Sequence, residues 1–404
     1  MIKSIIKSFF FVFVFFLALV VGNRLMNKGH DNLTMEMAPA AFPVVTLLMD
    51  GVEYNRLFGY GQPMDVTFQR DTVTVLGEGR DTGFVVDTYG CEVEGISIEV
   101  RSTDGLRLIE NTPVTEYQAA GDRISGKFAL KDLIERDTEY SLGILLKLEE
   151  GGEIYYYTRV VWSDHLYAAE KLDYCMDFHE RLYDREAAEE LTKYLETNSR
   201  LEDNSSFHKV NIHSSFQQIT WGDLEVAEVG KPSVLLKDIA SQTASLLIDF
   251  IVSTVQGEKT TYYTVQEYFR IRYTPDRMYL LDYERTMEQI PDVEQLCAND
   301  KILLGITGMD VAMVESEDGN CIVFESANQL YSYNVTTNEL TVLFRFYDEE
   351  NKDVRTIHAE HSIRILDVGE GGNVQFAVYG YMNRGRHEGD VGIAVYSYNC
   401  ELKR

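Results

Sequence analysis

The chain has 404 residues, 45% of them hydrophobic, which is enough to build two or three domains with ordinary cores and excludes a wholly disordered chain. Lys and Arg total 37 against 65 for Asp and Glu, so the formal net charge is -28. Such a charge repels the phosphates of DNA and RNA. Nucleic acid is therefore excluded as a partner.

The N-terminus opens with a basic segment followed by an apolar run. Lys3 and Lys7 precede Phe9–Val21, which is 13 uninterrupted apolar residues. A secretory signal has an apolar stretch of about 7 to 15 residues, whereas a membrane span needs about 17 to 25. The segment 1–28 is interpreted as an uncleaved signal anchor with its membrane flank, and a cleaved signal is the alternative.

The basic residues on either side of this run bear on the topology. Lys3 and Lys7 precede the run, and Arg24 and Lys28 follow it, so the positive-inside bias is slight. A short N-terminal tail inside the cell is the favoured topology. It predicts a single-pass protein of the cell membrane whose bulk is extracytoplasmic, with residues 29–41 as a polar stalk.

Five cysteines are scattered widely along the chain, without a CxxC pair or a dense framework. This spacing indicates small apolar residues rather than a disulfide scaffold, and one or two real bridges are the alternative. The five are Cys91, Cys175, Cys297, Cys321 and Cys400.

Residues 42–162 are predicted to form a β-sandwich-like module. Ile96, Ile98 and Val100 alternate with polar residues, which is the pattern of a half-buried strand. Short strands at this spacing, separated by Gly, Asp and Asn, are typical of an antiparallel sandwich. The predicted strands include Val44–Met49, Asp65–Phe68, Thr72–Leu76, Gly83–Asp87, Ile96–Arg101, Arg123–Phe128, Ser141–Leu148 and Ile154–Trp162.

The apolar period then changes from two to 3.6, which predicts a helical pair over 163–200 with a break at Asp184. Residues 201–254 are predicted to form a mixed linker module. Within it, alternation over Phe207–Trp221 predicts a short hairpin.

A weak internal repeat marks the C-terminal third. Tyr279–Glu284, Gln329–Asn334 and Ala394–Asn399 correspond to one another, and a Gly-Asn turn followed by an apolar strand precedes the last two. One unit contains four candidate strands, which are Val311–Val314, Cys321–Glu325, Leu330–Asn334 and Leu340–Phe346. Residues 255–404 thereby resemble β-propeller blades.

The resemblance implies an incomplete propeller, because a closed ring takes about 4 to 8 blades and the region holds fewer. The chain is thus expected to be a truncated portion of a longer protein. The predicted fold class is mainly β, made of a signal anchor, a β-sandwich-like module, a short helical pair and propeller-like repeats. An ordinary antiparallel meander is the alternative for the last region.

The sequence contains no recognised motif for catalysis or metal binding. His358 and His361 flank Glu360, but they lack the spacing of a helical HExxH zinc site. No GxSxG elbow or P-loop is present, and no pair can be chosen among 65 carboxylates. The catalytic residues stay unknown, and no cofactor or metal is predicted.

The sequence is most consistent with a non-enzymatic, membrane-anchored binding or scaffold protein of the cell envelope. Its partner would be a protein or a glycan, and its N-terminal segment would hold it to the membrane. A propeller-bearing carbohydrate-active enzyme is the competing function, because motif absence is weak evidence where a site is built from scattered loops.

Overall fold

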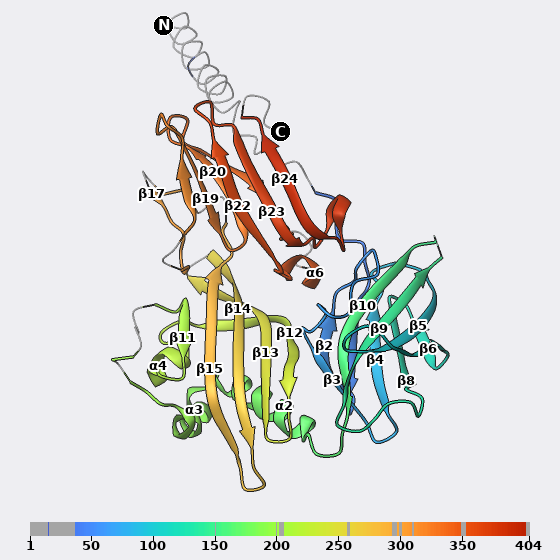
Figure 1. The fold of residues 1–404 in the computed structure, drawn as a ribbon. Helices are drawn as coiled ribbons and strands as arrows, with labels where there is room; N and C mark the ends of the chain where they lie inside the picture. The colour runs from blue at the N-terminus through green and yellow to red at the C-terminus, as the bar shows by residue number, and fades with distance from the viewer. Residues whose placement is uncertain are drawn as a thin grey trace, which may run out of the picture.

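The molecule has three parts that follow one another along the chain and meet at a common junction (Figure 1). The computed structural model describes Phe15 and residues 37–149, 151–198, 200–201, 206–256, 259–292, 297–298, 301–308, 311–348 and 353–400. The predicted signal anchor at 1–28, apart from Phe15, and most of the stalk at 29–41 lie outside these ranges. Within them, no helix is both long enough and apolar enough to cross a membrane.

The first part consists of two five-stranded sheets packed across one core, with strand orders β2-β1-β4-β8-β7 and β3-β10-β9-β5-β6. The predicted alternation is confirmed, because Ile96, Ile98 and Val100 are buried in β5. The strands are β1 (Val44–Met49), β2 (Val52–Leu57), β3 (Val73–Leu76), β4 (Asp81–Asp87), β5 (Val93–Ser102), β6 (Leu108–Val114), β7 (Tyr117–Ala120), β8 (Arg123–Ala129), β9 (Glu139–Leu148) and β10 (Glu153–Trp162).

One strand predicted for this part is wrong. Residues 65–68 form a turn, because the Asp65 carboxylate accepts hydrogen bonds from the backbone N–H and the hydroxyl of Thr67. The Phe68 N–H also donates to the Asp65 carbonyl at 3.1 Å. An aspartate that bonds to the backbone two residues ahead offers the chain a local turn in place of a sheet ladder.

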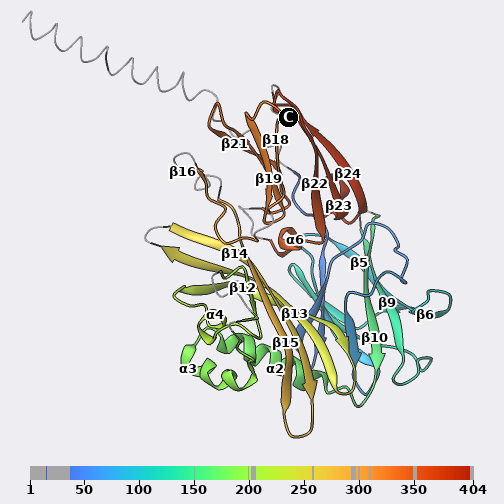
Figure 2. The ribbon, with the colours of Figure 1, turned by 60° about the vertical axis from the view of Figure 1, so that its left-hand side comes forward.

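The second part is a strongly curved antiparallel sheet with helices along one face (Figure 2). The strand order is β11-β15-β14-β13-β12. The helices are α2 (Ala168–Arg181), α3 (Arg185–Ala188), the 3-10 helix η1 (Glu189–Tyr194) and α4 (Phe216–Ile219). The strands are β11 (Lys209–Asn211), β12 (Val226–Ile239), β13 (Thr243–Gln256), β14 (Lys259–Tyr273) and β15 (Met278–Gln289).

The predicted helical break at Asp184 is confirmed, since its side chain caps α3 by accepting from the N–H groups of Glu186 and Ala187. The predicted hairpin over Phe207–Trp221 is wrong. Strand β11 is followed by helix α4, whose first turn is capped by the Ser215 hydroxyl accepting from the Gln218 N–H. A serine at this position favours a helix start over a strand turn.

The expected boundary between residues 254 and 255 falls inside β13, so one continuous sheet joins the regions expected to be separate. Tyr279–Glu284 belongs to β15 of this sheet and not to a blade-like unit. The pairing of β15 explains this. Nearly every residue of β15 pairs with β14, so the segment is held within the long central sheet.

The third part contains a four-stranded sheet, β18-β19-β20-β21, packed against a three-stranded sheet, β22-β23-β24. The sheets contain β18 (Met313–Glu315), β19 (Cys321–Ser326), β20 (Gln329–Asn334), β21 (Glu339–Phe344), β22 (His361–Val368), β23 (Val374–Tyr381) and β24 (Val391–Tyr398). Shorter elements are β16 (Cys297–Ala298), β17 (Lys301–Ile302), α6 (Val354–Ile357) and η2 (Gly385–His387).

The four strands predicted for one repeat unit are therefore confirmed as β18 to β21. Gln329–Asn334 is the third strand of the first sheet, and β24, which contains most of Ala394–Asn399, is the third strand of the second. The repeat thus describes two successive antiparallel sheets. These sheets alone do not show a propeller.

Asn55 joins the sandwich to the second part. Its fully buried side chain donates to the Val73 carbonyl of β3 at 2.8 Å and accepts from the Leu236 N–H of β12 at 2.8 Å. Its backbone lies in the left-handed region, with φ 48°, beside the bulge in the β1–β2 ladder. Asparagine tolerates this conformation better than most residues.

We expect Asn55→Gly to lower the free energy of unfolding by about 2 kcal/mol, because the buried Val73 carbonyl and Leu236 N–H lose their hydrogen-bond partner. Glycine still adopts the positive φ, so the backbone is not strained by the substitution. Asn111→Ala, at an exposed asparagine of β6, is the control and should change stability by less than about 0.5 kcal/mol. Urea unfolding of both variants measures this. Equal stabilities for the two variants would show that Asn55 does not hold the interface.

Candidate functional site

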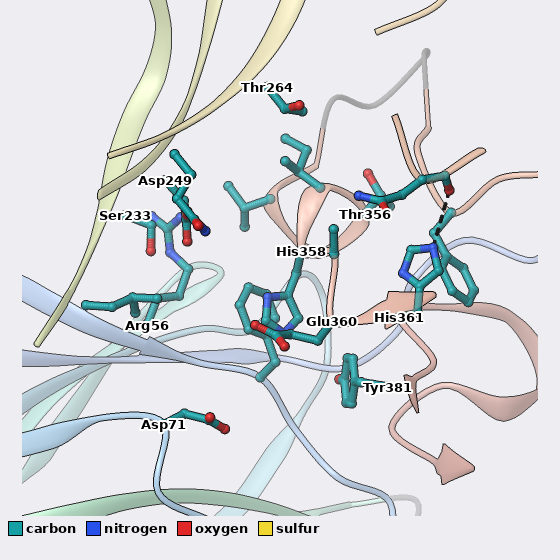
Figure 3. A pocket seen from close by; sticks show the side chains of 18 of the residues that line it. Arg56, Asp71, Ser233, Asp249, Thr264, Thr356, His358, Glu360, His361 and Tyr381 are labelled. Carbon is teal, nitrogen blue, oxygen red and sulfur yellow. Dashed lines mark hydrogen bonds between the residues drawn. The ribbon is translucent and has the colours of Figure 1, made fainter. Parts of the chain in front are cut away.

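A cavity of about 930 Å³ lies where the three parts meet (Figure 3). Strand β2 and the loop after it supply one wall, the helix-free face of β12 to β15 supplies the second, and the segment around α6 with the ends of β20 and β23 supplies the third. Ligand sites occur preferentially at such junctions and commonly have this size. The cavity is therefore the leading candidate for a binding site.

Side-chain alternation explains which residues of the second part reach the cavity. Successive residues of a strand point to opposite faces of the sheet. In β13 and β14, Ile248 and Glu267 are buried toward the helices, while Asp249, Thr264 and Gln266 point the other way, into the cavity. One face of this sheet thus builds the core and the other builds the site.

Aromatic side chains line much of the remaining surface. Phe58 stacks on His358 with ring centroids 3.8 Å apart and an interplanar angle of 13°. Tyr60 meets Tyr157 at 5.8 Å and Tyr381 edge-on at 5.5 Å. The Tyr381 hydroxyl donates to the Gly59 carbonyl at 2.8 Å, which fixes the third part against the sandwich. These contacts hold the walls in place and present ring surface to the cavity.

Two cations and a carboxylate gather on one side of the cavity. Arg56, from β2, lies beside Asp249, from β13, in Figure 3, and Lys237 joins them from β12. Burial lowers the pKa of Arg56 and raises the pKa of Asp249, whose carboxylate accepts from Gln266 Nε2 at 2.8 Å. Within the described residues, neither the Arg56 guanidinium nor the Lys237 ammonium has a hydrogen bond or an ion pair.

Asp71, Glu360 and His358 also line the cavity (Figure 3). The pKa of Glu360 is raised, first by burial and then by the nearby Asp71 charge. Burial lowers the pKa of His358 to about 3 and that of His361 to about 4, so both imidazoles are neutral at neutral pH. His361 Nε2 lies 3.3 Å from the Asn328 carbonyl, whereas its buried Nδ1 has no hydrogen-bond partner among the described residues.

The His358, Glu360 and His361 side chains noted in the sequence are therefore brought to one wall of the cavity. They do not form a metal centre. Across the described ranges, no group of three or more His, Cys, Asp or Glu side chains is placed to hold a metal ion. Arg56, Asp71, Lys237 and Asp249 were not singled out by sequence reasoning, because no local motif contains them.

A second cluster of charges lies on the helix side of the central sheet. His179 of α2 is buried between two carboxylates, with Nδ1 2.7 Å from Glu267 and Nε2 2.9 Å from Glu228. The Tyr283 hydroxyl donates to Glu267 at 2.8 Å. None of these four residues lines the junction cavity, so the cluster docks α2 onto the sheet rather than forming part of the site.

The charges of this cluster depend on one another. Burial alone lowers the pKa of His179, but the two carboxylates outweigh it and raise that pKa to about 9. Burial likewise raises the pKa of Glu267, and the His179 charge and hydrogen bond outweigh it, so the Glu267 pKa is lowered. The imidazolium is therefore the charged form that the folded protein favours.

The stability that His179 contributes should be complete below its usual pKa of 6.5 and be lost as pH rises through about 9. His179→Gln should remove this alkaline loss and lower the free energy of unfolding by about 3 kcal/mol at pH 7, because the buried Glu267 loses the cation to which it is hydrogen-bonded. Thermal unfolding between pH 6 and 10 measures both effects.

His165→Gln, at an exposed histidine, serves as the control and should follow the wild-type profile. Identical slopes above pH 8 for the wild type and His179→Gln would contradict the assignment.

Comparison with known proteins gives no relative from which to transfer a function. No protein-family model matches the chain, and no curated protein is significantly similar to it.

Proposed function

We propose that the protein is a membrane-anchored, extracytoplasmic binding protein of the cell envelope and that its junction cavity binds a glycan. The observation that carries this proposal is the combination of ring surfaces with the Arg56 and Lys237 cations, neither of which has a side-chain hydrogen bond or ion pair in the part of the chain that the structure describes. Aromatic faces suit the apolar faces of sugar rings. Carboxylates, neutral imidazoles and guanidinium groups suit sugar hydroxyls, which both donate and accept hydrogen bonds.

The size of the cavity supports the same ligand class. A cavity of about 930 Å³ is at the large end of the range for small-molecule sites and accommodates several sugar rings. Its lining comes from distant parts of the chain, so the ligand would contact all three parts at once. Binding would then also stabilise the junction, because a ligand that binds only the folded form shifts unfolding by mass action.

The proposed location rests on the N-terminal sequence. The basic residues Lys3 and Lys7, followed by the apolar run Phe9–Val21, favour a signal anchor with the bulk of the chain outside the cytoplasm. For the third part, the two packed sheets and their sequence repeat support propeller-like blades as the finer description of the fold.

Isothermal titration of the full chain in detergent with neutral oligosaccharides, namely β-1,4-linked N-acetylglucosamine and α-linked glucose oligomers, tests ligand binding. We expect one class to bind and Glu360→Gln to weaken binding about tenfold, because a charge-assisted hydrogen bond is worth about 1.5 to 3 kcal/mol. Glu78→Gln, at an exposed turn far from the cavity lining, is the matched control and should bind as the wild type does.

Equal affinities of Glu360→Gln and Glu78→Gln for the oligosaccharide would show that the cavity is not the binding site. Binding of an extended peptide at a Glu360-dependent site, without oligosaccharide binding, would replace the glycan with a protein partner.

A carbohydrate-active enzyme is the second candidate, and one observation favours it. The pKa of Glu360 is raised by burial and by the charge of Asp71, and a carboxyl group with a raised pKa near a second carboxylate is what glycoside hydrolysis requires. The same titrations distinguish the two functions. Shortening of the oligosaccharide by the wild type, lost in Glu360→Gln while binding persists, would make the protein a hydrolase.

The location has its own test. Protease added to intact cells, or to spheroplasts where an outer membrane encloses them, should degrade the region after Asn23, and fractionation should recover the untreated chain with the membranes. A cytoplasmic protein that stays intact is the control. Complete protection of the region would reverse the topology.

A further inference from the structure

Two cysteines that are distant in the sequence meet at the interface between the last two sheets. Cys321 begins β19, and Cys400 follows β24. Both sulfur atoms lie over the turn between β22 and β23. A Cβ atom at Gly372 of that turn would meet Cys400 Sγ at 3.1 Å and Cys321 Sγ at 3.9 Å. Both sulfur atoms therefore lie within 4 Å of one point beside Gly372.

Hydrogen bonds hold both residues at this place. The Cys400 N–H donates to Asn373 Oδ1 at 3.0 Å, which attaches the end of the last strand to the same turn. The Cys321 N–H donates to the Ser316 hydroxyl at 2.9 Å. Cys321 is only 3% exposed and belongs to the core between the two sheets. The two thiols are therefore brought close together by hydrogen-bonded backbone at both residues.

The other cysteines with described side chains lie elsewhere. Cys175 is fully buried in α2, and Cys91 Sγ donates to the Ala41 carbonyl in the sandwich. Cys321 and Cys400 thus form the one cysteine pair brought together within the described side chains. We propose that these two residues form a disulfide that ties the last strand of the chain to the preceding sheet.

Bond formation needs an oxidant, and a small-molecule disulfide such as oxidised glutathione supplies it. The Cys400 thiol, which is half-buried and more accessible than Cys321, loses its proton and attacks the oxidant, releasing one glutathione thiol. The Cys321 thiol then loses its proton and attacks the Cys400 sulfur of the mixed disulfide, releasing the second. Two electrons and two protons pass from the cysteines to the oxidant, which becomes two thiols.

Bond formation requires the Cys321 sulfur to leave the Ser332 hydroxyl, which lies 3.2 Å from it. A disulfide requires the sulfurs to approach to about 2.05 Å. Cys400 lies beyond Tyr398, the last residue of the β23–β24 ladder, so its side chain can turn toward Cys321 without breaking a strand pair. The bond would close a loop that contains β19 to β24, which restricts the unfolded chain strongly.

The test uses the purified full chain in detergent, kept first in dithiothreitol and then in oxidised glutathione, with alkylation of remaining thiols and peptide mass spectrometry. We expect a peptide pair that links Cys321 to Cys400 with a mass lower by two hydrogens. The oxidised protein should also unfold at a temperature higher by roughly 5 °C, reversibly on reduction.

Cys400→Ser and Cys321→Ser should each abolish the linked peptide and the thermal shift, while Cys175→Ser should retain both. Cys400→Ser, at the more exposed position, keeps the test decisive if Cys321→Ser does not fold. A glutathione adduct on Cys400 without the linked peptide, or a link to a different cysteine, would overturn the proposal. The outcome does not depend on whether the cavity binds a glycan.

Discussion

The fully buried side chain of Asn55 is the interaction on which the arrangement of the molecule depends. The sandwich and the central sheet share one apolar core, but apolar packing alone is not directional and tolerates more than one docking geometry. Asn55 selects one geometry, because its amide is bonded at once to β3 and to β12. A buried amide has few geometries in which both its donor and its acceptor are paired. The same restriction positions one wall of the cavity, because Arg56, the next residue along β2, lines it.

A second set of contacts positions the C-terminal part. The Glu388 carboxylate accepts from the N–H groups of Ala41 and Phe42, and Arg355 donates to the Phe42 carbonyl at 3.0 Å. Residues close to the stalk are therefore held by residues near the other end of the chain. If the N-terminal segment anchors the protein, the anchor leads into these contacts, because the first strand of the sandwich starts just after them, at Val44.

The parts of the fold set by local pattern could be predicted from the sequence. The alternation in β5, the break at Asp184 and the strands of the blade-like unit depend on neighbouring residues, and the structure confirms them. The errors arose where a single hydrogen bond decides between two local structures, as at Asp65 and Ser215. The boundary inside β13 was missed because a long strand continues where composition suggests a new region.

The site was harder to predict than the fold, for a physical reason. Its residues come from strands that are adjacent only after the three parts dock, so no spacing in the sequence records them. One signal was available. Asp249 interrupts the apolar run of β13, and a carboxylate within such a run has to face something other than a core. His358 and Glu360 were visible as a cluster, but their partner Asp71 lies far away in the sequence.

The charges of the cavity narrow the kind of glycan it would accept. The lining holds four carboxylates and three cations, which are Asp71, Asp249, Glu288 and Glu360 with Arg56, Lys231 and Lys237. Its histidines at 358 and 361 are neutral, so they do not offset the carboxylates. The whole chain is also strongly acidic, at -28. A polyanionic glycan would therefore be repelled both on approach and within the cavity, whereas a neutral or amine-bearing glycan would meet carboxylates that can accept its hydrogen bonds.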